Sequence, residues 1–78
     1  MTETPIKSIN LQGLLCPMPV IKVTRALREI QVGEMLEAYG TDPAIMADIP
    51  AWCRSTGNEL ITLEKTGEQY RFVVRRTK

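Results

Sequence analysis

The first part of the chain changes from one hydrophobic period to another. Residues 7–11 (Lys-Ser-Ile-Asn-Leu) alternate polar and apolar side chains, which predicts a short strand. Residues 17–30 place apolar side chains at helical spacing, which predicts a helix with lysine and arginine on its solvent-exposed face. Its apolar positions are Val20, Val23, Leu27 and Ile30. We expect Gly33 in the C-cap region, because glycine readily adopts the left-handed conformation used there.

The middle of the chain repeats this order of strand and helix. Residues 34–40 predict a second strand. Asp42 and Pro43 then indicate a helix start, with Asp42 as the cap and Pro43 at the first helical position. We expect the second helix to run to about Ser55 and to stop at Gly57.

Two strands joined by a tight turn complete the pattern. Residues 59–65 and 69–76 predict these strands, with Thr66-Gly67 as the turn. One face of the last strand carries Tyr70, Phe72 and Val74. The order βαβαββ predicts an α/β (α+β) two-layer sandwich, in which two helices pack on one face of a four-stranded mixed sheet. Residues 1–78 are enough for one domain, and we expect residues 1–6 to be flexible.

Cys16 is the most distinctive residue of the chain, within the sequence Gly-Leu-Leu-Cys-Pro-Met-Pro-Val. Proline is favoured at the first helical position, so Pro17 predicts Cys16 as the N-cap residue. Because Pro17 and Pro19 lack N–H groups, we expect the amides of Met18 and Val20 to face the sulfur. Together with the helix dipole they would lower the pKa of the thiol. The alternative is an inert cysteine, since free cysteine often packs as a small hydrophobe.

Several residues near Cys16 are candidates for supporting it or for contacting a partner protein. The candidate supporting residues surround the cysteine and are Gly13, Pro17, Met18, Pro19 and Val20. The candidate docking residues combine apolar and charged side chains and are Leu14, Leu15, Lys22, Arg25 and Asp42. Each docking candidate also has a structural interpretation. The leucines would shield the sulfur, the basic residues would form a solvated helix face, and Asp42 would only cap a helix.

Composition narrows the classes of function. Ten basic and nine acidic residues give a net charge of +1, so we expect no nucleic acid or anionic membrane as a partner. No segment approaches the roughly 20 apolar residues of a membrane span. The first residues lack the pattern of a signal peptide, and the cytoplasm is therefore the expected compartment. The chain has no histidine, the commonest general base and metal ligand, and we expect no metal or organic cofactor.

The two cysteines do not form a recognised pair. Cys16 and Cys53 should both be reduced in the cytoplasm. Without a Cys-x-x-Cys spacing, a thioredoxin-like dithiol and a zinc ribbon are both disfavoured. Cys53 lies beside Trp52 in an amphipathic stretch, where core packing is its expected role.

A series of short motifs resembles the TusA/SirA family of small sulfur-carrier proteins, over about residues 8 to 76. The motifs are Gly13-Leu14-x-Cys16-Pro17-x-Pro19-Val20, Gly33-Glu34, Asp42-Pro43, Asp48-Ile49-Pro50 and Gly57-Asn58-Glu59-Leu60. The resemblance implies the βαβαββ fold and a cysteine of the Cys-Pro-x-Pro element, here Cys16, that accepts sulfane sulfur as a persulfide. It also implies a cysteine desulfurase or rhodanese-like donor and a cysteine of another protein as acceptor. In one branch of the family the sulfur reaches 2-thiouridine in tRNA, and other branches serve sulfur oxidation or cofactor pathways.

Met18 departs from the family pattern, because some members, notably in the tRNA branch, carry an acidic residue at this position. The leading hypothesis is a cytoplasmic, monomeric persulfide carrier that acts as a sulfur relay rather than as a stand-alone enzyme. One alternative is a small RNA-binding or regulatory module, which rests on the element order alone. The other is a thiol redox sensor in which Cys53 resolves an oxidised Cys16.

Overall fold

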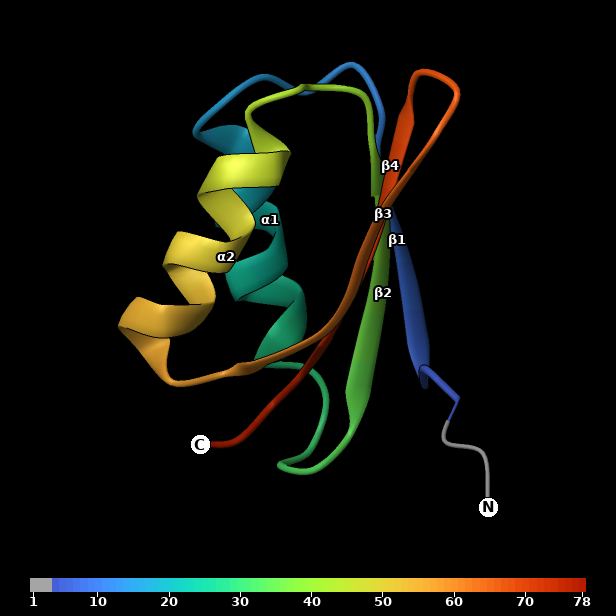
Figure 1. Cartoon of the computed structure of the whole chain (residues 1–78). Coiled ribbons are helices and arrows are strands. Elements are labelled where there is room, and N and C mark those ends of the chain that lie inside the picture. Colours follow the sequence, from blue (N-terminus) through green and yellow to red (C-terminus); the bar gives the residue numbers. More distant parts are fainter. Residues whose placement is uncertain (1–3) are drawn as a thin grey trace.

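Two helices cover one face of a four-stranded sheet (Figure 1). The computed structural model describes residues 4–78. The strands are β1 (Lys7–Leu11), β2 (Met35–Gly40), β3 (Glu59–Thr66) and β4 (Gln69–Arg75), and the helices are α1 (Met18–Leu27) and α2 (Ile45–Thr56). The predicted βαβαββ order and two-layer architecture are confirmed.

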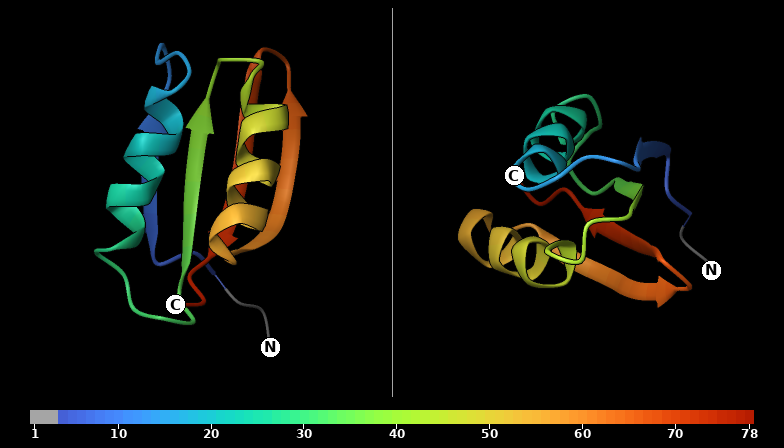
Figure 2. Two further views of the ribbon diagram at one scale, coloured as in Figure 1. Left: turned by 90° about the vertical axis from the view of Figure 1, so that its left-hand side faces the viewer. Right: turned by 90° about the horizontal axis from the view of Figure 1, so that it is seen from above.

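The strands lie in the order β1-β2-β4-β3 across the sheet (Figure 2). β1 pairs with β2 in parallel, whereas β4 is antiparallel to both β2 and β3. A parallel pair requires a crossover connection, which α1 provides here. β1 and β2 run in the same direction, so both strands end at the same end of the sheet. The chain starts both helices from that end. We call residues 12–17 and 41–44 the upper edge, after their place in Figure 1.

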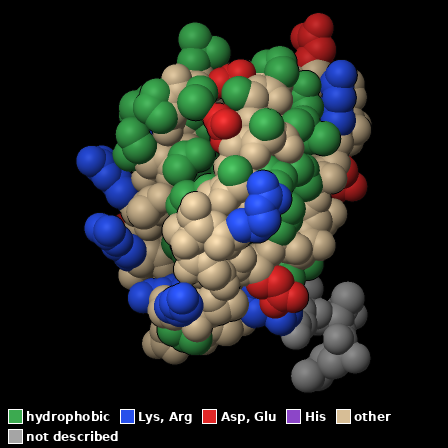
Figure 3. Space-filling view, turned by 60° about the vertical axis from the view of Figure 1, so that its left-hand side comes forward, with side chains coloured by type: hydrophobic (Ala, Val, Ile, Leu, Met, Phe, Trp, Pro, Cys, Tyr) green, Lys and Arg blue, Asp and Glu red, His purple; other side chains and the backbone are tan. Residues whose placement is uncertain are grey.

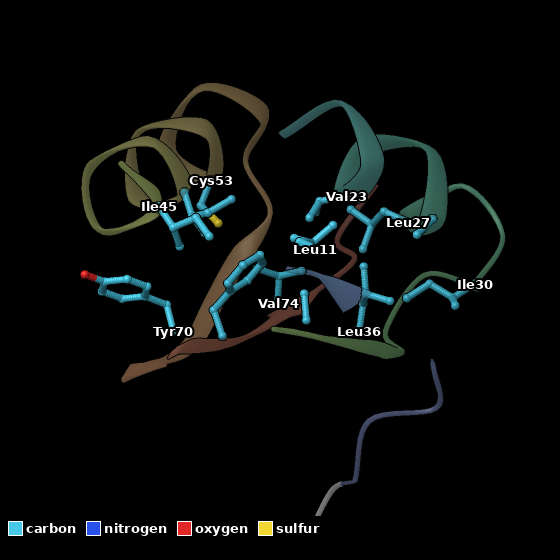
Figure 4. Packing of buried hydrophobic residues seen from close by; sticks show 13 residues of the cluster. Leu11, Val23, Leu27, Ile30, Leu36, Ile45, Cys53, Tyr70 and Val74 are labelled. Carbon is cyan, nitrogen blue, oxygen red and sulfur yellow. The ribbon is translucent and has the colours of Figure 1, made fainter. Parts of the chain in front are cut away.

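The hydrophobic core lies between the helices and the sheet (Figure 4). Alternation along β4 directs Tyr70, Phe72 and Val74 towards the helices, and all three are buried, as the sequence predicts. The largest fully buried side chains are Phe72, Leu11, Leu36, Ile45, Ile49, Val23 and Val74. Burial of each such side chain contributes roughly 1.5–3 kcal/mol. This packing fixes both helices, and with them the upper edge, on the sheet.

The opposite face of the sheet carries paired charges. Arg71 of β4 donates to Glu37 of β2 at 2.7 Å and to Glu64 of β3 at 2.9 Å. Burial works against the charge of Glu37, but hydrogen bonds from Arg71 and Ser8 outweigh it and lower the pKa of Glu37. These cross-strand pairs stabilise the register of three strands.

The boundaries of α1 differ from the predicted ones at both ends. The helix begins at Met18 and ends at Leu27 instead of Ile30. Residues 28–30 continue as a turn with hydrogen bonds from residue i+3 to residue i, so Ile30 stays buried although the helix has ended. Gly33 has a φ of 94° but lies in the turn before β2, and its prediction as part of the C-cap region is wrong.

The end of α2 agrees with the sequence better than its start. The helix begins at Ile45 with Ala44 as the N-cap residue, so the prediction of Asp42 as the cap and Pro43 as the first helical residue is wrong. Gly57 ends α2 in the left-handed conformation, with a φ of 82°, as predicted. A glycine stop is encoded locally, whereas a helix start depends on which backbone amides the neighbouring side chains reach.

The predicted flexible segment, residues 1–6, lies partly outside the described residues, which begin at residue 4. The amide of Ile6 donates to the carbonyl oxygen of Met35 at 2.9 Å and so ties the chain to the start of β2. Within residues 4–78, none of the helices combines the length and apolar character that a membrane crossing requires.

Candidate functional site

Cys16 lies at the upper edge, in the loop between β1 and α1 (Figure 1). It is a free cysteine and is exposed to solvent. The loop starts with a β-turn in which the amide of Leu14 donates to the carbonyl oxygen of Leu11 at 3.2 Å. Gly13 supplies the positive φ of 79° that this turn uses, and a side chain at that position would strain the backbone. Gly13 therefore shapes the loop that presents Cys16.

Two hydrogen bonds join the Cys16 loop to the loop that precedes α2. The amide of Cys16 donates to Asp42 Oδ2 at 2.8 Å, and the amide of Gly13 donates to Thr41 Oγ1 at 3.0 Å. The second carboxylate oxygen of Asp42 accepts from the amide of Ala44 at 3.0 Å. Asp42 thus holds the backbone of Cys16 against the start of α2. It is a bridge between the two loops of the upper edge.

Cys16 is not the N-cap of α1. That position belongs to Pro17, one residue later, and the Cys16–Pro17 peptide bond is cis. The amide of Met18, which the sequence predicts to face the sulfur, donates instead to the carbonyl oxygen of Leu15 at 2.8 Å. The helix start therefore does not supply the Met18 amide to the sulfur, and this part of the predicted support is wrong.

Asp48 lies in the first turn of α2. The pKa of Cys16 is raised, first by hydrogen bonding to the Asp48 carboxylate, then by slight desolvation and by the negative charges of Asp48 and Asp42. The prediction of a lowered pKa is wrong, because the fold brings two carboxylates near Cys16 and both raise its pKa. The sequence marks Asp48 only as an acidic residue near a helix start, and nothing local shows that it meets Cys16.

Apolar side chains lie exposed around the upper edge. Leu15 is 69% exposed, Met46 of α2 46%, Met18 39% and Ile21 38%. Figure 3 shows hydrophobic side chains gathered at the upper end of the helical side, with acidic side chains among them. Large exposed hydrophobic side chains near a reactive group are typical of a protein contact surface. Leu15 and Met18 thus have the exposure that contact with a partner requires.

The other apolar candidates from the sequence face inwards. Leu14 and Val20 are partly buried and pack against the core, and Pro19 is buried. Leu14 is less exposed than Leu15, and its docking role stays a prediction. These residues anchor the loop and the first turn of α1 to the core.

Lys22 and Arg25 are exposed on α1, as a solvated face or a docking patch would both require. Figure 3 shows lysine and arginine side chains below the apolar region of the helical side. The helical side of the molecule thus carries apolar side chains near the upper edge and basic side chains farther along the helices.

Cys53 lies in a different environment. It is only 5% exposed, and Figure 4 shows its sulfur directed into the core. Burial raises its pKa. It follows Asp48 by more than one turn of α2, so the helix carries it away from the upper edge. The prediction of core packing is confirmed, and the fold does not place Cys53 beside Cys16.

The chemistry available at the upper edge is that of one accessible sulfur. Among residues 4–78, no group of three or more His, Cys, Asp or Glu side chains is arranged to hold a metal ion. Cys16 is a free, exposed cysteine that can form a covalent bond to an incoming sulfur once the proton of its thiol is removed.

Comparison with known proteins connects this site to a family. The family model described as sulfurtransferase TusA matches residues 7–76. "Putative sulfur carrier protein YrkF" of Bacillus subtilis is 38% identical over 68 residues. The matched region is 87% of this chain but only 37% of YrkF, so the chain spans little more than a third of that relative.

Other relatives match over nearly their full length. A protein of Halobacterium salinarum, also named "Putative sulfur carrier protein", is 39% identical over 79 residues. The match covers 100% of this chain and 93% of that relative. The crystal structure of a SirA-like protein from Desulfitobacterium hafniense superposes with a TM-score of 0.78, covering 94% of this chain and all of the other. At 20% identity this last similarity shows the fold alone.

Proposed function

Because the chain belongs to the sulfurtransferase TusA family, whose model spans residues 7–76, we propose that it carries sulfur as a persulfide on Cys16. The donor is the persulfide of a cysteine desulfurase or of a rhodanese-like protein. The acceptor is a cysteine of another protein. The chain acts as a relay between these partners and needs no metal or organic cofactor for this chemistry.

The observation that carries the proposal is the exposed Cys16 thiol on an ordered loop. Hydrogen bonds to Asp42 and Thr41 fix the loop. Leu15, which is 69% exposed, lies next to the cysteine in the chain. A sulfur relay must present one sulfur atom to two different proteins, and a fixed, accessible cysteine beside exposed apolar side chains meets that requirement.

The transfer balances without a further reagent. The Cys16 sulfur attacks the outer sulfur of a donor persulfide anion, R–S–S⁻. The S–S bond of the donor breaks, a new S–S bond forms on Cys16, and the donor sulfur leaves. The Cys16 proton ends on that leaving sulfur, so the products are the Cys16 persulfide anion and R–SH. The same exchange in reverse roles passes the sulfur to the acceptor.

The proposal includes the cytoplasm as the compartment, since thiols remain reduced there, and a monomer as the working form. The destination of the sulfur is tRNA 2-thiouridine, or a sulfur-oxidation or cofactor pathway. Met18 stands where some members of the tRNA branch carry an acidic residue, which favours the other destinations.

Intact mass spectrometry tests the carrier role. The protein is incubated with a cysteine desulfurase and cysteine, and separately with a rhodanese and thiosulfate. We expect a gain of one sulfur atom that a reductant removes and that Cys16→Ser abolishes, while Cys53→Ala still gains it. If Cys16→Ser gains sulfur as the wild type does, Cys16 is not the carrier. If neither donor loads the wild type, the carrier proposal fails for both donor classes.

Two other classes give different results. An RNA-binding module would bind RNA in a salt-dependent way, and that binding would survive Cys16→Ser. A redox sensor would form a Cys16–Cys53 disulfide in peroxide, which requires the two Cα atoms to lie within about 7 Å of each other. The burial of Cys53 in the core opposes such a disulfide.

A further inference from the structure

A pocket of about 200 Å³ lies where both helices end, at the opposite end of the molecule from the upper edge. Leu27 of α1 and Trp52 of α2 form the apolar part of its wall. The segment after β4 passes between the lower ends of the two helices and adds Arg76 and Lys78 to the wall (Figure 2). We call this cavity the lower pocket, after its place in Figure 1.

The lower pocket has an unbalanced positive charge. Its wall contains the three cationic side chains of Arg28, Arg76 and Lys78 and no acidic side chain. Among residues 4–78, none of these three cations forms an ion pair with another residue. Glu29, the acidic neighbour of Arg28 in the chain, pairs with Lys7 instead. The protein therefore gathers three positive charges around one cavity without neutralising them by a side chain.

Hydrogen bonds fix Arg76 in the wall of the lower pocket. The amide of Arg76 donates to the carbonyl oxygen of Glu34 at 3.0 Å, and its own carbonyl oxygen accepts from the amide of Gly33 at 2.7 Å. Its guanidinium donates to the main-chain oxygens of Ile30 and Lys78. An arginine carries more N–H donors than these two bonds use, so the guanidinium is held in place and still has hydrogens to donate.

The rest of the segment after β4 is tied to the end of α2. The amide of Thr77 donates to Asn58 Oδ1 at 3.1 Å, and Thr77 Oγ1 donates to the carbonyl oxygen of Gly57 at 2.7 Å. Asn58, which also lines the pocket, donates one Nδ2 hydrogen to Thr56 Oγ1 at 3.0 Å and keeps a second one. These bonds hold residues 76–78 against the helices, so the lower pocket belongs to the folded structure.

We propose that the lower pocket binds a small tetrahedral oxyanion, such as phosphate, sulfate or the phosphate group of a small ester, through Arg28, Arg76 and Lys78. A phosphate group carries about −1.5 to −2 charges at pH 7 and several strong acceptor oxygens. The wall supplies positive charge and N–H donors, the partners that such a group requires. Pockets for drug-sized ligands have roughly 300–1,000 Å³, so a pocket of about 200 Å³ selects a smaller ligand.

The ends of the helices do not reverse this charge balance. The last carbonyl groups of α1 and α2 each carry a partial charge of about −0.5, which is small beside three full positive charges. Leu27 is buried and Trp52 is partly buried next to the cations. An apolar neighbourhood strengthens the attraction between the cations and a bound anion relative to open water.

The proposed anion site is independent of the carrier role of Cys16. The ten residues of α1 span about 15 Å between the upper edge and the lower pocket, so an anion bound there does not touch the sulfur. It would contact residues that follow α1 and β4 and lie beside α2, and would thereby connect three segments of the fold. A ligand that binds only the folded protein raises the free energy of unfolding by mass action.

The fluorescence of Trp52 tests the proposal directly, because this residue lines the lower pocket and is the only tryptophan. The full chain is titrated at pH 7 with sodium phosphate, sodium sulfate and glycerol 3-phosphate, and with sodium chloride at matched ionic strength. The same titrations are made on Arg28→Gln and on Arg54→Gln. Arg54 is the matched control, since it is also an exposed arginine near the end of a helix but does not line the pocket.

We expect a saturable change of fluorescence with at least one oxyanion and none with chloride. The ligand with the lowest midpoint identifies whether an inorganic anion or a phosphate ester is preferred. Arg28→Gln should raise that midpoint at least about fivefold, because it removes a charged donor, while Arg54→Gln should leave it within about twofold of the wild type. Equal responses to chloride and the oxyanions, or equal weakening in both variants, would show only general attraction and overturn the proposal.

Nuclear magnetic resonance locates the anion without a variant. In ¹H–¹⁵N spectra of the wild type, phosphate should shift the amide signals of Arg28 and Arg76 and the indole N–H signal of Trp52, and leave that of Cys16 in place. Shifts centred on the upper edge would overturn the proposal. So would the absence of a saturable response in both the spectra and the fluorescence.

Discussion

The two cysteines of this chain show how differently one fold treats the same side chain. The pKa of Cys16 is raised by a hydrogen bond to Asp48 and by nearby negative charge, while the pKa of Cys53 is raised by burial. Cys16 is exposed on the loop before α1, and Cys53 is 5% exposed in the core. A partner protein can reach a residue on an exposed loop but not a residue of the core. Only the thiol at the upper edge is therefore open to reaction with a partner.

The largest effect should come from placing a charge at the buried position. Cys53→Asp puts a carboxylate into the core, and we expect it to lower the free energy of unfolding by at least about 3 kcal/mol. Cys53→Ala should cost only about 1 kcal/mol, as a modest change of packing. Urea unfolding followed by the fluorescence of Trp52, the only tryptophan, measures both. Equal stability of Cys53→Asp and the wild type would mean that this side chain does not face the core.

A smaller loss of stability should follow at the upper edge. Asp42→Ala removes the acceptor for the amides of Cys16 and Ala44, and we expect a loss of about 1–2 kcal/mol in the same urea experiment. Amide hydrogen exchange of Cys16 should become faster. Asp42→Asn, which keeps one carbonyl oxygen as an acceptor, should lose less than Asp42→Ala. If the Cys16 amide exchanges at the wild-type rate in Asp42→Ala, the bridge between the two loops does not hold this loop.

The smallest effect should be a dependence of stability on pH. Both thiols have a higher pKa in the folded protein than in the unfolded chain, so the unfolded chain loses these protons first as the pH rises. The stabilisation by the two thiols is complete below the ordinary cysteine pKa of about 8.5. It is lost as the pH rises through the raised values. Cys53→Ala and Cys16→Ser should each reduce the decline of the unfolding free energy with pH. A decline that persists unchanged in both variants would assign it to other groups.

The sequence predicted the features that depend on neighbours in the chain. The alternation of Tyr70, Phe72 and Val74 identified the buried face of β4, and Gly57 identified the end of α2. Cys16 stands out in the sequence because a cysteine directly before Pro17, at an expected helix start, is unusual. Patterns of this kind are set by side-chain periodicity and by backbone conformation, both of which are readable from a single segment.

The features that the sequence did not predict depend on contacts between distant segments. The lowered pKa expected for Cys16 rests on the helix start alone, and it is wrong because the fold places the negative charges of Asp42, after β2, and Asp48, in α2, near Cys16. In the same way, the local sequence predicts Asp42 as a helix cap, whereas in the structure its carboxylate accepts a hydrogen bond from the amide of Cys16 in the other loop of the upper edge. The reactive state of Cys16 is therefore a property of the folded upper edge and not of its own motif.

The most direct test of the account is to locate the transferred sulfur. The wild-type protein is loaded by a productive donor, its persulfides and thiols are blocked with an alkylating reagent under native conditions, and the peptides are sequenced by mass spectrometry. The account predicts that the added sulfur lies on the peptide that contains Cys16, with Cys53 neither loaded nor alkylated until the protein is denatured. Added sulfur on Cys53, or distributed between both cysteines, would contradict it.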